Sequence, residues 1–365
     1  MTINVWSYLK EFENEREETM SAVEQVFRSG KLILGENVKN FELSMAAYCG
    51  VKHGVGVNSG TDALFLAMKA LGIGDGDEVI TVSNTAIPTV SAIVSTGAIP
   101  KFVDINPETY LMDVNQVEKA ITAKTKCIIA VHLYGQCVDM AALKQITVKR
   151  EIALIEDCAQ STGARQNGMV AGSMSDLACL SFYPTKILGA YGDGGMVITN
   201  SETHMAKLRR LRMYGTEKTY YSEEHGFNSR LDEIQAAILL KKLTHLGEYI
   251  SRRVELARRY EKKLKGTSLL LPKIQKGNQH AYYLYVVRHP ERDRIIAELA
   301  AKNINVNISY PHPIHLMRGY QSLGHKIGDL PHTELAAKEI FSIPMYPTLT
   351  DKEQDYVCEV LVSSV

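Results

Sequence analysis

From about residue 38 onward, the hydrophobic pattern of this chain switches repeatedly between helical and strand spacing. Val38, Phe41, Met45 and Tyr48 recur at steps of three and four residues, which is typical of an amphipathic helix. The alternation then predicts strands at 53–57, 78–82, 99–103, 125–131, 152–157, 177–182 and 195–199, and helices at 61–71, 86–96, 114–121 and 140–150. Short strands joined by helices need crossover connections. We therefore expect an α/β fold with a mostly parallel sheet covered by helices on both faces.

The second half of the chain has a different pattern. A charged, amphipathic stretch over 231–263 predicts a pair of long helices that links two domains. Beyond it we expect a strand and two helices separated by proline-rich loops, at 281–287, 292–302 and 333–341. A length of 365 residues fits two domains. We predict a large α/β domain with an N-terminal arm over 1–246 and a smaller C-terminal α+β domain over 247–365.

Charge and cysteine content argue against several classes of function. Lys and Arg total 41, as do Asp and Glu, so the chain lacks the basic excess of a protein that coats nucleic acid. A local basic patch stays open, although the arginine-rich run at 208–212 is more typical of a solvated helix face. The six cysteines form no CxxC pair, as expected of reduced thiols in the cytoplasm. No apolar run approaches the ~20 residues that span a bilayer, and the glutamate-rich start is unlike a signal peptide.

Polar residues at strand ends are the first candidates for a site, because ligands bind beyond the carboxyl ends of strands in open parallel sheets. The strand at 53–57 turns through Ser59, Gly60 and Thr61 directly into a helix. Free N–H groups at a helix start suit a phosphate, although an ordinary Ser/Thr cap gives the same pattern.

Two further strand ends carry ionisable residues. Asp157 closes an apolar strand, where a carboxylate can hold a cationic cofactor nitrogen or simply cap a turn. Lys186 lies between an apolar strand and a loop with glycines at 189, 192, 194 and 195. A partly desolvated lysine at such a place can form a Schiff base, whereas a solvated surface lysine is the alternative.

No metal site is predicted. His312 and His315 have a suggestive spacing, but prolines prevent a regular helix there and no third ligand lies near in sequence. A pair of loop histidines is therefore the better interpretation. The chain also lacks the G-x-S-x-G elbow of serine hydrolases.

Taken together and in order, these segments resemble the sugar aminotransferases of the DegT/DnrJ/EryC1/StrS family. The resemblance covers nearly the whole chain and is carried by the motifs at 29–35, 58–64, 131–136, 155–160, 181–195, 226–235, 310–316 and 343–347. Members are pyridoxal 5'-phosphate (PLP) enzymes of fold type I. The resemblance thus implies a mostly parallel sheet flanked by helices, a smaller C-terminal α+β domain, and PLP as cofactor with pyridoxamine 5'-phosphate as an intermediate form.

The resemblance also implies a role for each matching residue. Lys186 would form the Schiff base with PLP and later move the proton between carbon atoms. Asp157 would pair with the protonated pyridine nitrogen, and Gln160 would lie near the phenolic oxygen. The phosphate would be held by the N–H groups of Gly60 and Thr61, the hydroxyl of Ser181 and Asn228 of the partner subunit. The active unit would therefore be a homodimer with shared active sites.

Two local features refine the expected reaction. Many relatives place an aromatic residue after Asn84-Thr85 to stack on PLP, whereas this chain has Ala86, so a small apolar contact replaces the ring or stacking comes from elsewhere. A dehydratase branch of the family has a histidine in place of the lysine. This chain retains Lys186, which favours transamination. Relatives that aminate C3 often read Leu-Gly-Ala-x-Gly-Asp-Gly-Gly after the lysine, as residues 188–195 do here.

The resemblance therefore predicts transfer of an amino group from L-glutamate to C3 of a dTDP-linked 3-keto-6-deoxyhexose. The alternatives are a C4 aminotransferase, an enzyme for a UDP-linked 3-keto sugar, and a non-catalytic PLP-binding regulatory protein. Tyr183, Tyr310, His312 and His315 are the candidates to line the sugar pocket.

Overall fold

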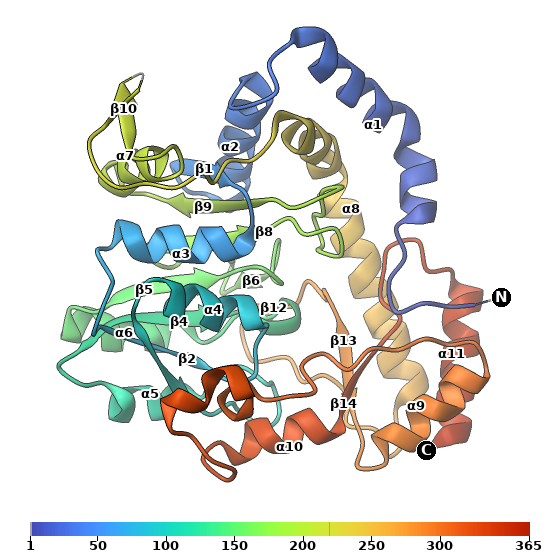
Figure 1. Ribbon diagram of the computed structural model, residues 1–365. Helices are drawn as coiled ribbons and strands as arrows, with labels where there is room; N and C mark the ends of the chain where they lie inside the picture. Colours follow the sequence, from blue (N-terminus) through green and yellow to red (C-terminus); the bar gives the residue numbers. More distant parts are fainter. Residues whose placement is uncertain (1, 219) are drawn as a thin grey trace.

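The computed structural model describes residues 2–218 and 220–365 (Figure 1). Its two largest hydrophobic cores meet along one long helix. Its helices are α1 (Leu9–Ser29), α2 (Glu36–Cys49), α3 (Gly60–Ala70), α4 (Ile87–Ser95), α5 (Val114–Ala120), α6 (Met140–Arg150), α7 (Glu202–Leu211), α8 (Glu233–Leu264), α9 (Arg292–Ala301), α10 (Pro331–Glu339) and α11 (Asp351–Ser364). Short 3-10 turns lie at Leu133–Gly135, Ile314–Leu316 and Arg318–Leu323.

A seven-stranded sheet forms the centre of the molecule. Its strands are β1 (His53–Val57), β2 (Glu78–Val82), β3 (Ile99–Val103), β4 (Thr125–Val131), β5 (Ala153–Asp157), β8 (Leu177–Ser181) and β9 (Gly195–Thr199). They lie in the order β1-β9-β8-β5-β4-β2-β3, and β9 alone runs antiparallel to its neighbours. The other pairs, from β8 to β3, are parallel, so the predicted sheet is confirmed.

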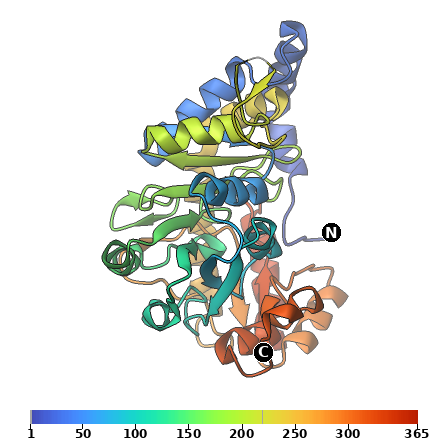
Figure 2. The same cartoon turned by 60° about the vertical axis from the view of Figure 1, so that its left-hand side comes forward.

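The part of the chain that the structure describes also forms three smaller sheets. They are formed by β6 (Arg165–Gln166), β7 (Met169–Val170) and β12 (Asn278–Gln279), by β10 (Thr216–Lys218) and β11 (Tyr221–Ser222), and by β13 (Tyr285–Arg288) and β14 (Ile340–Ile343). The last pair belongs to the C-terminal elements, which gather at the end of the molecule opposite α7 and β9 (Figure 2).

Helices cover both faces of the central sheet. All residues of β2, β8 and β9 are buried, which requires cover on each side. Helix α3 packs on β8 and β9, while α2 packs on β1. Within the described residues, no helix combines the length and the apolar character needed to cross a membrane.

The predicted pair of helices over 231–263 is wrong: α8 is one continuous helix of 32 residues. It contains no proline, and no residue within it adopts the left-handed conformation that ends a helix. Gly247 is helical despite the ~1 kcal/mol that glycine costs relative to alanine. Packing on both halves of the helix offsets this cost, since Leu246 belongs to the first core and Leu256 to the second.

Two boundaries and the burial of one arginine also differ from the sequence-based expectation. The strand predicted at 281–287 begins only at Tyr285, because Tyr282 has a φ of 49° and turns the chain. The helix predicted at 333–341 starts at Pro331 and ends before β14. Arg212, predicted on a solvated face, is buried and forms an ion pair with Glu42.

Candidate active site

A cavity of about 250 Å³ opens at the carboxyl ends of the parallel strands. It lies where β1, β4, β5 and β8 end and where β9 begins, so residues far apart in sequence meet there. The structure brings together eight of the predicted site residues in its lining: Gly60, Thr61, Ala86, Asp157, Gln160, Ser181, Tyr183 and Lys186. Tyr183 is 52% exposed and lies at the edge of this group.

The N-terminus of α3 forms one wall of the cavity. The Ser59 side chain caps the helix by accepting a hydrogen bond from the N–H of Asp62 at 3.1 Å. A Cβ atom at Gly60 would lie 2.6 Å from the Cβ of Ser181, so only glycine lets the helix start approach β8 this closely. The wall therefore combines free backbone N–H groups with the Ser181 hydroxyl, a combination that suits a phosphate.

Asp157 provides a buried carboxylate at the end of β5. Its Oδ2 accepts a hydrogen bond from the Thr89 hydroxyl at 2.8 Å, and its Oδ1 accepts one from the N–H of Ala159 at 3.1 Å. Burial raises the pKa of Asp157, while these hydrogen bonds and the charge of Lys186 act in the opposite direction. A cationic group bound in the cavity would stabilise the ionised carboxylate further.

Gln160 is held between two tyrosines. Its Oε1 accepts the N–H of Tyr134 at 2.9 Å, and its Nε2 donates to the hydroxyl of Tyr310. The two tyrosine rings stack with a centroid separation of 6.3 Å and an interplanar angle of 9°. Both tyrosines have positive φ angles, 59° and 72°, and such strained backbone is common at functional sites.

Lys186 follows β8 and is half-buried at the cavity. Its backbone N–H donates to the carbonyl of Tyr183 at 2.8 Å. Its Nζ lies 4.5 Å from the centroid of the Tyr283 ring. An amine and a buried carboxylate thus share one cavity with a helix N-terminus, which is a set suited to a phosphorylated aldehyde with a cationic ring.

Four predicted residues lie outside the cavity lining. Asn228 and His312 are exposed, and Tyr310 reaches the site through Gln160. His315, predicted to line a sugar pocket, is instead buried and bonded on both sides of its ring. Burial lowers the pKa of His315, which favours its neutral form.

Sequence reasoning missed three residues at the site: Thr89, His132 and Tyr283. Thr89 lies in the first turn of α4, where a threonine gives no signal of a distant carboxylate partner. His132 follows β4 at the same sheet edge as the predicted residues, so the strand-end rule could have identified it. Tyr283 comes from the C-terminal part of the chain, and only folding brings it to Lys186.

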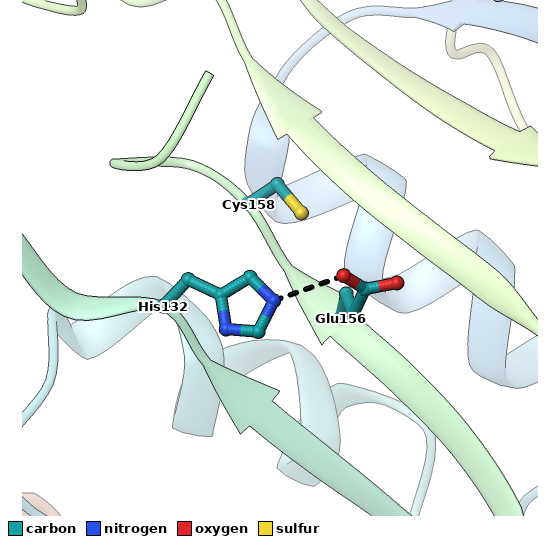
Figure 3. Close-up of side chains that lie close together, drawn as sticks. All are labelled: His132, Glu156 and Cys158. Atoms are coloured by element: carbon teal, nitrogen blue, oxygen red, sulfur yellow. Dashed lines mark hydrogen bonds and ion pairs between the residues drawn. The ribbon is translucent and has the colours of Figure 1, made fainter. Parts of the chain in front are cut away.

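His132, Glu156 and Cys158 place one potential metal ligand each within 4.8 Å of one another (Figure 3). The potential ligand atoms of His132 and Glu156 already form hydrogen bonds within the protein. The ring of His132 lies 2.9 Å from Glu156 through Nε2 and accepts the N–H of Val138 through Nδ1. Glu156 also accepts the N–H groups of Gly172 and Met174 and the Ser175 hydroxyl. The group is therefore a closed hydrogen-bond network that joins β4 to β5.

Comparison with known proteins relates the whole chain to one family. The model of the DegT/DnrJ/EryC1/StrS aminotransferase family matches residues 13–362. A dTDP-3-amino-3,4,6-trideoxy-alpha-D-glucose transaminase of Micromonospora megalomicea subsp. nigra is 54% identical, over 99% of this chain and 98% of its own length. A pleiotropic regulatory protein of Geobacillus stearothermophilus is 44% identical, over 98% and 97%. The crystal structure of S. venezuelae DesV in complex with a ketimine intermediate has a TM-score of 0.98 at 39% identity, covering 99% of this chain and 98% of that one.

Proposed function

This chain belongs to the DegT/DnrJ/EryC1/StrS family of PLP-dependent sugar aminotransferases, and from that premise we propose its substrates. It transfers the amino group of L-glutamate to C3 of a dTDP-linked 3-keto-6-deoxyhexose, giving a dTDP-3-amino-3,6-dideoxyhexose. The main support for transamination is that the Lys186 amine and the Asp157 carboxylate line one cavity beside the start of α3. The choice of C3 and dTDP is supported by the loop at 188–195 and by the name of the 54% identical relative.

The residues of the cavity fit PLP. When bound, PLP supplies an electron sink for negative charge that develops on the amino-bearing carbon. Asp157 would hold a cationic ring nitrogen, whose charge would add to that of Lys186 in stabilising this buried carboxylate. The N–H groups of Gly60 and Thr61 and the hydroxyl of Ser181 hold the phosphate.

Lys186 handles the proton of the reaction. As a free amine it would accept the proton that leaves the substrate carbon and return it to the carbon on the other side of the amino nitrogen, so that no external acid or base is consumed. Gln160 would donate the second N–H of Nε2 to the phenolic oxygen of PLP, because the first N–H is donated to Tyr310. Ala86 contributes a small apolar contact in the cavity wall.

The active unit that we propose is a cytoplasmic homodimer. Asn228 is exposed, while the adjacent Ser229 is fixed by bonds to Asp62 and to the N–H of Asn58. Asn228 is therefore presented outward and is available to the phosphate of the partner's site. The sugar lies toward Tyr183 and Tyr310, with His312 near its rim. We also propose that the chain divides into domains over 1–246 and 247–365.

A half-reaction tests the substrate. The PLP-loaded protein is mixed separately with dTDP-3-amino-6-deoxy, dTDP-4-amino-6-deoxy and UDP-linked 3-amino sugars, and the absorbance of the bond between Lys186 and the cofactor is followed. Selective loss with the dTDP-3-amino sugar is expected. Selective loss with the 4-amino sugar would overturn the C3 assignment, and loss only with the UDP sugar would overturn the nucleotide.

A regulatory protein without catalysis is the second candidate, because a relative with that printed name is 44% identical. L-glutamate separates the two. A spectral change on its addition supports catalysis, and Lys186→Ala provides the matched control that retains the cavity without the reacting amine. Silence with glutamate and with every amino sugar would favour the regulatory candidate.

A further inference from the structure

Tyr283 lies beside Lys186, the residue whose position matters most for the reaction. The Nζ of Lys186 lies 4.5 Å from the centroid of the Tyr283 ring, and the Tyr283 hydroxyl lies 3.0 Å from the hydroxyl of Thr185. The ring face of tyrosine attracts a cation, whereas the bond to Thr185 fixes where that face points. Two independent contacts thus join Tyr283 to consecutive residues of the lysine-bearing segment.

The backbone that carries Tyr283 is itself clamped. Arg253, on α8, donates from one nitrogen to the carbonyls of Tyr282, Tyr283 and Met345, at 3.1, 3.3 and 2.9 Å. The guanidinium is buried, and this burial lowers the pKa of Arg253 to about 10. Within the described residues Arg253 forms no ion pair and its buried Nε has no hydrogen-bond partner, so its side-chain hydrogen bonds are the three from Nη1 to these carbonyls.

The other side of the same segment rests on a turn at the cavity. The N–H of Ala281 donates to the carbonyl of Gly135 at 2.8 Å, and the N–H of Leu284 to that of Tyr134 at 3.3 Å. Gly135 has a φ of 111°, and a Cβ there would lie 2.8 Å from the backbone nitrogen of Tyr282. The segment at 281–284 is therefore held between this turn and α8, which leaves the Tyr283 ring little freedom.

We propose that Tyr283 is a positioning residue for Lys186: its ring face holds the ammonium form of the lysine at the cavity whenever the lysine is not bonded to the cofactor, and Thr185 and Arg253 hold the ring in place. The inference rests on the proposed role of Lys186 as the reacting amine. It assigns to the C-terminal part of the chain a direct part in placing that amine.

The test uses the cofactor-free protein, so it does not depend on which sugar or nucleotide the enzyme takes. Lys186 is acylated with acetic anhydride over a range of pH, and the modified peptide is quantified by mass spectrometry relative to exposed Lys39. Loss of the ring in Tyr283→Leu is expected to shift the pH profile of Lys186 acylation downward by about half a pH unit, because the ammonium form loses its aromatic partner. A change in access alone would alter the height of the profile and leave its position unchanged.

Conservative variants separate the ring from its anchor. Tyr283→Phe keeps the ring, so its acylation profile is expected to lie close to the parent's. Thr185→Val is expected to have the same small effect, and the double variant is expected to show no larger change. Tyr282→Phe, whose ring stacks on His280 instead, is the matched control. In the loaded enzyme, Tyr283→Leu is expected to lower kcat at least about fivefold with an unchanged KM for the sugar. A Tyr283→Leu acylation profile at the position of the parent's would overturn the inference even if the proposed transamination is correct.

Discussion

The Nδ1 atom of His315 lies 2.8 Å from the hydroxyl oxygen of Ser83, and this hydrogen bond joins the loop after Pro313 to the end of β2. The same hydroxyl accepts the backbone N–H of His315 at 3.0 Å, so the hydroxyl proton is directed to Nδ1. Nε2 then carries the ring hydrogen toward Glu334 at 3.3 Å. His315 thus holds the loop that follows Tyr310 against the site.

Substitution of His315 is expected to disturb this loop. His315→Ala leaves the proton of the Ser83 hydroxyl buried without an acceptor, which should lower the free energy of unfolding by about 1–3 kcal/mol. The KM for the sugar should rise, because the loop that carries Tyr310 loses its anchor. Denaturant unfolding and steady-state kinetics measure the two effects. His332→Ala, an exposed histidine of the same region, is the control, and equal stability of the two variants would contradict the anchoring role.

The hydrogen bond from Thr89 to Asp157 should set the acid limit of activity. Because burial raises the pKa of Asp157 and the Thr89 bond opposes this, Thr89→Val should raise the pKa further. Asp157 is then charged only at higher pH, so the acid limb of kcat/KM should move upward, by about one pH unit. Thr89→Ser should keep the parent profile. An unchanged profile in Thr89→Val would show that its hydroxyl does not support the charged carboxylate.

Gly60→Ala should weaken cofactor binding. The added Cβ would lie 2.6 Å from that of Ser181, so the start of α3 must move away from β8. Loss of the phosphate contacts should raise the dissociation constant of PLP about tenfold or more, as fluorescence titration would measure.

Two further variants test the steric cause at Gly60. Ser181→Gly removes the clashing atoms together with a phosphate ligand, so the double variant should bind PLP about as well as Ser181→Gly alone. Gly247→Ala, with open space around it in α8, should leave PLP affinity unchanged and stabilise the helix by up to about 1 kcal/mol. Normal affinity in Gly60→Ala would show that close approach at this position is dispensable.

Glu15 should make stability depend on pH. Burial, reinforced by the charge of Glu11, raises its pKa to about 7, while Lys242 and His245 act in the opposite direction. Because the pKa of Glu15 is raised, the folded state binds this proton more tightly than the unfolded state does. The stabilisation that comes from binding the proton is therefore lost as the pH rises from 4.5 to about 7.

Glu15→Gln removes that dependence. The variant should match the parent below pH 4.5 and be more stable above pH 7, by about 1–2 kcal/mol. Glu13→Gln, on the exposed face of α1, is the control. Thermal unfolding of the variant and the parent across this pH range measures the effect. An equal increase in stability below pH 4.5 and above pH 7 would point to a cause other than the ionisation of Glu15.

The sequence by itself determined the alternation of strands and helices that builds the mostly parallel sheet. The strands at 53–57, 78–82, 99–103, 125–131 and 195–199 have the predicted bounds, because the hydrophobic period that encodes them is local. Strand-end chemistry also placed Asp157 and Lys186 at one edge of the sheet, since parallel strands deliver their carboxyl ends together.

Tertiary structure alone decided which side chains hold these residues in place. Thr89 reaches Asp157 across 68 positions, and Ser83 meets His315 across 232. Tyr283 lies over Lys186 only because Arg253 and the turn at Gly135 clamp the segment between them. The continuity of α8 likewise depends on two cores that pack against its halves. Contacts over such separations follow from packing, and local periodicity carries no record of them.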